Sequence, residues 1–188
     1  MLGVCCRTAG IVGLTGLAVL GCTRDADEAG GGQTPTITLR PADPAFAAGR
    51  PVALTVEIRN TWNQRCLLTS APMGALTVLG LTRDGTPLAP QLTTATFLNG
   101  FQNAVKDSLV EVAPGASVRF EYSGPDGTLD SFAADATGGA EVSRWPVAAR
   151  GRYELTVGYL RPPLPGVPAD PCQASGTTAT ATFTVGQP

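Results

Sequence analysis

Very few side chains in this sequence are suited to acid–base or nucleophilic catalysis. The 188 residues include no histidine and a single lysine, Lys106, which stands two residues before Ser108. Without histidine, a Ser-His-Asp triad, a Cys-His pair and HExxH zinc chemistry are all excluded. A serine–lysine dyad would have to use Lys106 and Ser108, whose spacing is not that of a Ser-x-x-Lys motif on a helix. A solvated lysine is the simpler interpretation, and we expect that the protein is not an enzyme.

Three carboxylates, Asp126, Asp130 and Asp135, lie close together in a segment rich in glycine and alanine. Calcium prefers several carboxylates and carbonyls from one loop, but this spacing is not that of an EF-hand. Aspartate is common in turns, so turn formation is the simpler interpretation. A pair of cysteines without histidine also makes a poor zinc site. We therefore expect neither a metal nor a cofactor.

Among the five cysteines, Cys66 and Cys172 are candidates for a disulfide. Cys66 follows a strand predicted at 52–59, and Cys172 lies between strands predicted at 151–159 and 178–185. If these strands are B, F and G of an immunoglobulin-like sandwich, the two cysteine-bearing loops lie at the same end of it. A bridge closing about 100 residues would stabilise the fold by about 4–5 kcal/mol on the loop-entropy model. Two unpaired thiols are the alternative.

Two segments are candidates for binding a partner. Trp62 and Arg65 stand in a polar loop beside Cys66, and these residue types often dominate interfaces. The alternative is that Trp62 folds back to cover the edge of the core or the disulfide. The proline-rich segment 160–168 is expected to be semi-rigid and could dock a partner in an extended conformation. Packing of this loop against the domain is the alternative.

The segments that position these residues are predicted to be strands. The clearest is 52–59, where Val52, Leu54, Val56 and Ile58 alternate with mostly polar side chains. Other alternating segments lie at 36–40, 76–82, 108–112, 118–122, 151–159 and 178–185. Between them, 97–107 favours at most a turn or two of helix, and the stretch from 123 to 150 is predicted to form a loop. We predict an all-β fold, a single immunoglobulin-like antiparallel β-sandwich of about seven or more strands over residues 36–188.

Residues 1–21 have the features of an export signal. The uncharged run at 11–20 is too short for a membrane span of about 20 residues but fits a secretory h-region. It ends in Val19-Leu20-Gly21-Cys22, which resembles the lipobox of bacterial lipoproteins. That resemblance implies cleavage before Cys22, a diacylglycerol on its sulfur and acylation of the new amino group. A plain secretory signal, with Cys22 present by chance, is the alternative.

The next segment, 22–35, is predicted to be a lipidated cysteine and a flexible tether, since Thr23 to Pro35 includes no large apolar side chain. From Cys22 onward the chain has 12 basic and 15 acidic residues, a net charge of −3. This balance argues against nucleic-acid binding. Because Thr23 follows Cys22, the resemblance favours the outer membrane if the cell is Gram-negative. We expect a membrane-anchored lipoprotein of the cell envelope whose partner is an envelope protein or a glycan.

A weaker resemblance covers about 50 residues in the middle of the chain. The segments 109–120 and 149–157 are similar to sequences of the bacterial intracellular proteinase-inhibitor family and to all-β segments of some secreted metallopeptidases. It implies a β-sandwich, and it identifies no inhibitory residue. Two functions follow as expectations: a non-enzymatic envelope lipoprotein that presents a binding or structural module, or a protease inhibitor or accessory domain that acts on an exported peptidase.

Overall fold

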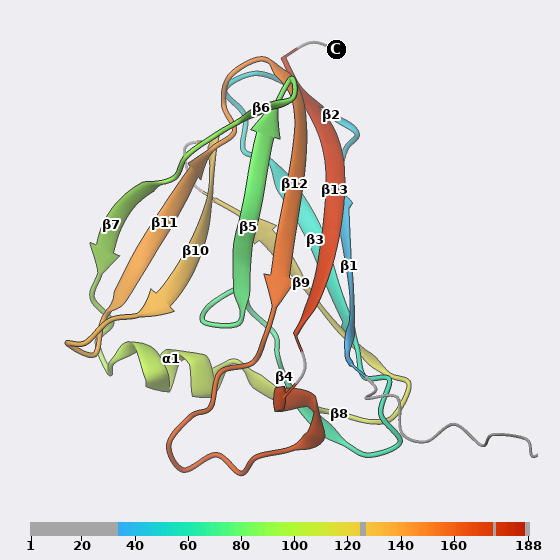
Figure 1. The fold of residues 1–188 in the computed structure, drawn as a ribbon, viewed down its shortest axis with the longest axis vertical. Helices are drawn as coiled ribbons and strands as arrows, with labels where there is room; N and C mark the ends of the chain where they lie inside the picture. Colours follow the sequence, from blue (N-terminus) through green and yellow to red (C-terminus); the bar gives the residue numbers. More distant parts are fainter. Residues whose placement is uncertain (1–33, 125–126, 175, 187–188) are drawn as a thin grey trace, which may run out of the picture. The chain divides into compact units, whose positions relative to one another are not determined.

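The computed structural model describes residues 34–124, 127–174 and 176–186. The predicted signal peptide, Cys22, the tether up to residue 33 and Asp126 lie outside these residues. Nearly all of the described secondary structure is β-strand, arranged in antiparallel sheets around a shared core (Figure 1). The prediction of an all-β sandwich is thereby confirmed. In the described residues, no helix combines the length and the apolar character needed to cross a membrane.

The first sheet has three antiparallel strands in the order β1-β3-β9. They are β1 (Thr36–Pro41), β3 (Ala53–Arg59) and β9 (Ser117–Ser123). The central strand shows why this sequence forms a half-buried sheet. Leu54, Val56 and Ile58 are fully buried on one face, while Thr55 and Arg59 are exposed on the other. This alternation is the one predicted for 52–59, because a strand turns successive side chains to opposite faces.

The second sheet has five strands in the order β2-β13-β12-β5-β6. They are β2 (Ala45–Phe46), β13 (Thr177–Val185), β12 (Gly151–Tyr159), β5 (Leu76–Arg83) and β6 (Thr86–Pro87). The short β2 runs parallel to β13, and the other pairs are antiparallel. Tyr153, Leu155, Val157 and Tyr159 are buried on one face of β12, as predicted. The exposed face of β13 carries Thr178, Thr180, Thr182 and Thr184.

The inward faces of these two sheets form one main hydrophobic core. Leu54 and Val56 of β3 belong to the same cluster as Leu155 of β12 and Phe183 of β13. The ring of Phe183 stacks on that of Tyr153, with 5.3 Å between ring centroids. This packing of sheet on sheet is the sandwich architecture. The finer immunoglobulin-like assignment stays a prediction.

A third sheet occupies the region that the sequence predicted to be a loop. The hairpin of β10 (Thr128–Ala134) and β11 (Ala140–Pro146) pairs with β7 (Gln91–Ala95), in the order β10-β11-β7. The loop prediction was wrong because β11 changes its buried face along its length. Ala140 and Val142 are buried at one end, where Ala140 joins a second, smaller hydrophobic cluster, whereas Trp145 joins the main core at the other end. A strand that buries opposite faces at its two ends shows no simple period-2 pattern.

A short helix and a two-stranded ribbon complete the fold. The helix α1 (Phe101–Asp107) buries Phe101 and Val105 and confirms the helical turn or two expected within 97–107. These two residues form a satellite core with Ala140 and with Leu164 of the proline-rich loop. The ribbon consists of β4 (Cys66–Thr69) and β8 (Leu109–Val112), and the 3₁₀ helix η2 (Pro171–Ala174) lies against β4.

Candidate functional site at the disulfide end

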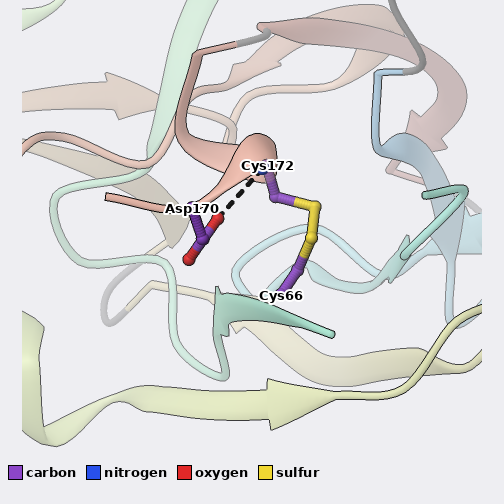
Figure 2. Close-up of side chains that lie close together, drawn as sticks. All are labelled: Cys66, Asp170 and Cys172. Atoms are coloured by element: carbon purple, nitrogen blue, oxygen red, sulfur yellow. Dashed lines mark hydrogen bonds between the residues drawn. A yellow bond between two sulfur atoms is a disulfide. The ribbon is translucent and has the colours of Figure 1, made fainter. Parts of the chain in front are cut away.

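Cys66 and Cys172 form a disulfide, with 2.00 Å between the sulfur atoms and 5.8 Å between the Cα atoms (Figure 2). Both cysteines are buried. The predicted pairing is therefore confirmed, although Cys66 begins the strand β4 rather than lying in a loop. Cys172 lies in η2, on the connection between β12 and β13. The bridge thus fastens the β12–β13 connection to the ribbon that follows β3.

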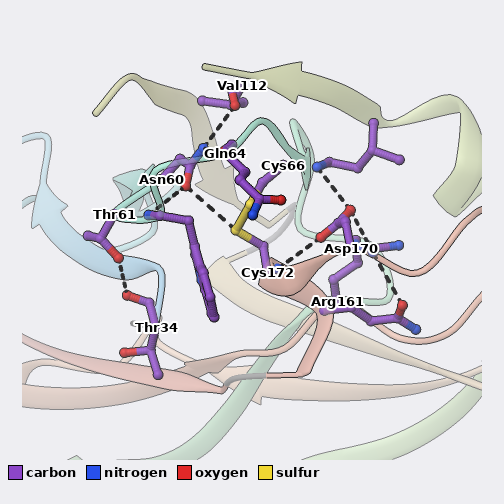
Figure 3. Close-up of a disulfide and its surroundings, with 12 residues drawn as sticks. Thr34, Asn60, Thr61, Gln64, Cys66, Val112, Arg161, Asp170 and Cys172 are labelled. Carbon is purple, nitrogen blue, oxygen red and sulfur yellow. Dashed lines mark hydrogen bonds and ion pairs between the residues drawn. A yellow bond between two sulfur atoms is a disulfide. The ribbon is translucent and has the colours of Figure 1, made fainter. Parts of the chain in front are cut away.

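Asp170 accepts hydrogen bonds from three segments around this disulfide. Its Oδ1 accepts a hydrogen bond of 2.9 Å from the backbone N–H of Cys172. Its Oδ2 accepts one of 3.1 Å from the N–H of Leu67 and one of 2.9 Å from the Arg161 guanidinium. Figure 3 shows these contacts converging from β4, η2 and the proline-rich loop. A carboxylate with three donors is well compensated for its partial burial.

Arg161 is the least expected member of this cluster, because its side chain has no solvent exposure. Its Nη2 pairs with Asp170 at 2.9 Å and lies 3.4 Å from the Gln173 Oε1. Its Nε and Nη1 find no hydrogen-bond partner among the described residues. A buried arginine needs a counter-charge, and here Asp170 supplies it. With the burial of Leu164, this pair shows that the proline-rich loop packs onto the domain.

Asn60 organises the other side of the disulfide and is fully buried. Its Nδ2 donates to the carbonyls of Gln64 and Val112, at 2.8 and 2.9 Å, and its Oδ1 accepts from the Trp62 N–H at 2.9 Å. These bonds shape the polar loop after β3 and tie it to β8. The Cys172 Sγ lies 3.7 Å from the Asn60 Oδ1. Sequence reasoning found neither Asn60 nor Arg161, since polar residues in loops carry no signal of burial.

The candidate binding loop presents its two residues differently. Trp62 is half-buried and packs against the main core, and its Nε1 is buried without a hydrogen-bond partner among the described residues. This placement supports the interpretation of Trp62 as a cover for the core edge. Arg65 is exposed and pairs with the exposed Glu111 at 2.8 Å. Such surface pairs contribute little to stability. A binding role for Trp62 and Arg65 remains a prediction.

Cys66, Asp170 and Cys172 have the residue types of a metal site, and their ligand atoms lie within 4.8 Å of one another. Metals bind the deprotonated thiolate, however, whereas these two sulfurs are bonded to each other. The Asp170 oxygens also already accept three hydrogen bonds. The arrangement is therefore structural: a disulfide surrounded by hydrogen bonds that hold neighbouring segments together.

The remaining chemical candidates have structural roles. The Ser108 hydroxyl donates to the Val105 carbonyl at 2.7 Å, at the end of α1. Asp130 is a buried strand residue rather than a turn residue, and it pairs with Arg144 across the β10–β11 hairpin at 3.0 Å. Asp135 does lie in a turn, where its carboxylate accepts hydrogen bonds from Thr137 and Gly139. The turn interpretation is thus confirmed for Asp135 and wrong for Asp130.

The disulfide end is consequently a cross-linked cluster of segments that contains one compensated ion pair with a buried arginine. Asp170 connects three separate segments at this end through its hydrogen bonds. Comparison with known proteins adds no family to this description: no protein-family model matches the chain, and no curated protein matches it.

Proposed function

We propose that this chain is a non-enzymatic lipoprotein of the cell envelope, anchored through Cys22, whose β-sandwich serves as a binding or structural module. The immunoglobulin-like assignment belongs to this proposal, as does outer-membrane location in a Gram-negative cell. The module's partner would be an envelope protein or a glycan.

One observation carries the proposal: the pairing of Cys66 with Cys172. Disulfides form and persist in oxidising compartments such as the periplasm and the cell surface, so the buried bridge supports export. From residue 22 onward the chain has three cysteines, and the bridge uses two. Cys22 is then the odd cysteine, placed where the lipobox resemblance requires one. Lipidation gives this cysteine a role, and attachment of two or more acyl chains makes the anchoring stable.

The test is the intact mass of the mature protein after expression of the full gene in a bacterial host. We expect a chain that begins at residue 22 and carries diacylglyceryl and acyl groups, with both modifications lost in Cys22→Ala. Cys6→Ala is the matched control, because it removes a cysteine from the segment that cleavage discards. An unmodified soluble product from the wild-type gene would contradict the proposal.

A second candidate function is a protease inhibitor or an accessory domain of an exported peptidase. The observation that favours it is the anchoring of the proline-rich loop by the buried Arg161 and Leu164, with Leu160 exposed just before Arg161 and Pro163 exposed between the two. A rigid exposed loop is what an inhibitor inserts into an active-site cleft. Replacing residues 165–168 or 62–65 with Gly and Ser would abolish inhibition of subtilisin or thermolysin if either loop inhibits. Equal proteolysis with and without the wild-type protein would exclude inhibition of these two enzymes.

A further inference from the structure

An open cavity of about 570 Å³ lies at one end of the third sheet, and none of the residues that line it belongs to the cluster around the disulfide. Figure 1 shows the elements that bring it together: the end of β7, the start of α1 and the turn between β10 and β11. Its lining includes Thr94, Thr96, Phe97, Asp135, Thr137 and Gly138. This volume falls within the range of small-ligand sites, about 300–1,000 Å³.

Asp135 supplies the only charged side chain among the residues that line this cavity. Its Oδ1 accepts three hydrogen bonds, from the Thr137 N–H at 2.7 Å, the Thr137 hydroxyl at 2.9 Å and the Gly139 N–H at 2.9 Å. The bond from the Thr137 side chain is the main cause that lowers the pKa of Asp135 below its ordinary value. The carboxylate is therefore fixed in position and ionised at neutral pH.

The second oxygen of Asp135 lies beside the glycine of this turn. The three hydrogen bonds described above all reach Oδ1, whereas Oδ2 lies against position 139, which is glycine. A Cβ at Gly139 would come within 2.8 Å of this oxygen and of the Ala95 carbonyl. The glycine thus allows the turn to approach β7 closely, and the Asp135 carboxylate lies among the residues that line the cavity.

Neutral polar groups and an aromatic ring surround this carboxylate. The exposed Thr94 and Thr96 hydroxyls make no hydrogen bond to other described residues, so they can both donate and accept. Gly138 has a φ of 89°, with open space where a side chain would stand. Phe97 forms the apolar wall, and its ring is held by Phe101, with 5.1 Å between ring centroids.

This combination selects among ligand classes. An anion would be repelled by Asp135, and a wholly apolar ligand would strip water from the carboxylate without replacing it. Calcium takes six to eight oxygens and usually several carboxylates, whereas this cavity offers one carboxylate with one oxygen already engaged. A neutral ligand with many hydroxyl groups meets every requirement. Its hydroxyls donate to the Asp135 carboxylate, exchange hydrogen bonds with the threonines and leave an apolar C–H face for Phe97.

We propose that the cavity between β7, α1 and the β10–β11 turn is a binding site for the pyranose units of a neutral oligosaccharide. This inference rests on the proposed function, because it names the partner of the envelope module as a glycan. The class of ligand, and not a particular sugar, follows from the arrangement of one carboxylate, three threonine hydroxyls and one aromatic ring.

The test is calorimetric titration of the full chain, purified in a detergent without a sugar headgroup. Cellotriose, tri-N-acetylchitotriose and mannotriose are the probes, all of them neutral, and we expect at least one of them to bind. Asp135→Asn keeps an oxygen for the three turn hydrogen bonds to Oδ1 but replaces the second carboxylate oxygen, an acceptor, with a donor. Thr96→Val removes one hydroxyl at constant shape. Each change is expected to weaken binding by about tenfold, the equivalent of one hydrogen bond to the ligand.

Thr182→Val is the matched control, because Thr182 is exposed on the outer face of β13 and lies outside this cavity. It is expected to leave the affinity unchanged, and circular dichroism confirms that all variants fold. Failure of all three oligosaccharides to bind, or equal binding by Asp135→Asn, Thr96→Val and the wild type, would overturn the inference. Binding of the peptide Ala-Lys-Ala in place of the sugars would also overturn it and would assign the cavity to a basic side chain. The mass measurement on Cys22 decides the anchoring separately from these results.

Discussion

Arg161 and Asp170 form an ion pair of 2.9 Å in which the arginine side chain is completely buried and the aspartate nearly so. The same carboxylate also holds the backbone of Leu67 and of Cys172. The pair is therefore unequal: Asp170 has other donors to satisfy it, whereas Arg161 has no other counter-charge among its hydrogen-bond partners.

This inequality predicts different costs for removing the two partners. Asp170→Ala leaves a guanidinium buried without compensation, so we expect the free energy of unfolding to fall by about 3–5 kcal/mol. Arg161→Met fills similar space and leaves Asp170 with its two backbone donors, so the loss should be clearly smaller. Urea denaturation of the oxidised protein measures both. A larger loss for Arg161→Met than for Asp170→Ala would contradict this account of the pair.

The disulfide is expected to contribute substantially to stability, because it closes a sequence separation of 106 residues. Replacing both Cys66 and Cys172 by Ala should lower the free energy of unfolding by about 3–5 kcal/mol, since the unfolded chain regains the freedom that the bridge removes. Denaturant unfolding with and without dithiothreitol provides the measurement. Reductant should lower the free energy of unfolding of the wild type to that of the variant and leave the free energy of unfolding of the variant unchanged. A wild type insensitive to complete reduction would show that the bridge adds no stability.

Two buried tyrosines predict a loss of stability at alkaline pH. Burial is the main cause that raises the pKa of Tyr122 and of Tyr159 above the ordinary value of 10.0. The unfolded chain ionises these phenols near pH 10, whereas the folded protein resists their ionisation. Their contribution is thus fully present below pH 10 and is lost as the pH rises above it. Urea unfolding between pH 8 and pH 11, about the range that brackets the unfolded pKa, should show this decline.

Tyr122→Phe isolates one of these groups. The variant should lose less stability between pH 9 and pH 11 than the wild type, because it has one phenol fewer to ionise, over about the same range. At neutral pH we expect no loss, since the Tyr122 hydroxyl is buried without a partner among the described residues. Tyr153→Phe is the matched control: its hydroxyl donates to the Ala149 carbonyl at 2.7 Å, and its removal should cost about 1 kcal/mol. An equal alkaline decline in wild type and Tyr122→Phe would refute the role given to Tyr122.

Substitution of Trp62 distinguishes a role of this side chain in stability from a role in binding a partner. Since its ring packs against the main core, Trp62→Ala should lower the free energy of unfolding by about 1–3 kcal/mol, less than for a fully buried tryptophan. Arg65→Ala should change it by less than about 0.5 kcal/mol, because the pair with Glu111 is exposed. Thermal or urea unfolding compares the two variants. Unchanged stability in Trp62→Ala would favour the binding interpretation of this loop.

The sequence predicted those parts of the fold in which one face of a strand is buried along its whole length. The strands β3 and β12 are examples, because their apolar residues recur at every second position. The β10–β11 hairpin was missed because it buries Asp130 and Ser131 beside Leu129, and because β11 changes its buried face before Trp145. Such a pattern depends on where the strand lies between two cores, which local sequence does not record.

The candidate site, like the fold, could be predicted from the sequence only in part. The pairing of Cys66 with Cys172 followed from the expected topology, since both cysteines flank predicted strands. Asn60, Arg161 and Asp170 acquire their roles only through contacts with distant segments, such as the bond from Asn60 to the Val112 carbonyl. The cavity at Asp135 depends in the same way on the return of β7 to the β10–β11 turn, a pairing with no signal in either segment alone.

The position of the disulfide also determines what a single cut in the backbone can release. Any cleavage between Cys66 and Cys172, the exposed proline-rich loop included, leaves two pieces that are still joined through sulfur. The piece with β13 would stay attached to the piece that leads back to Cys22. If the chain is anchored at Cys22 as proposed, shedding of the domain by proteolysis would therefore require a cut before Cys66, such as one in the segment between Cys22 and β1, or a reductant in addition to the peptidase.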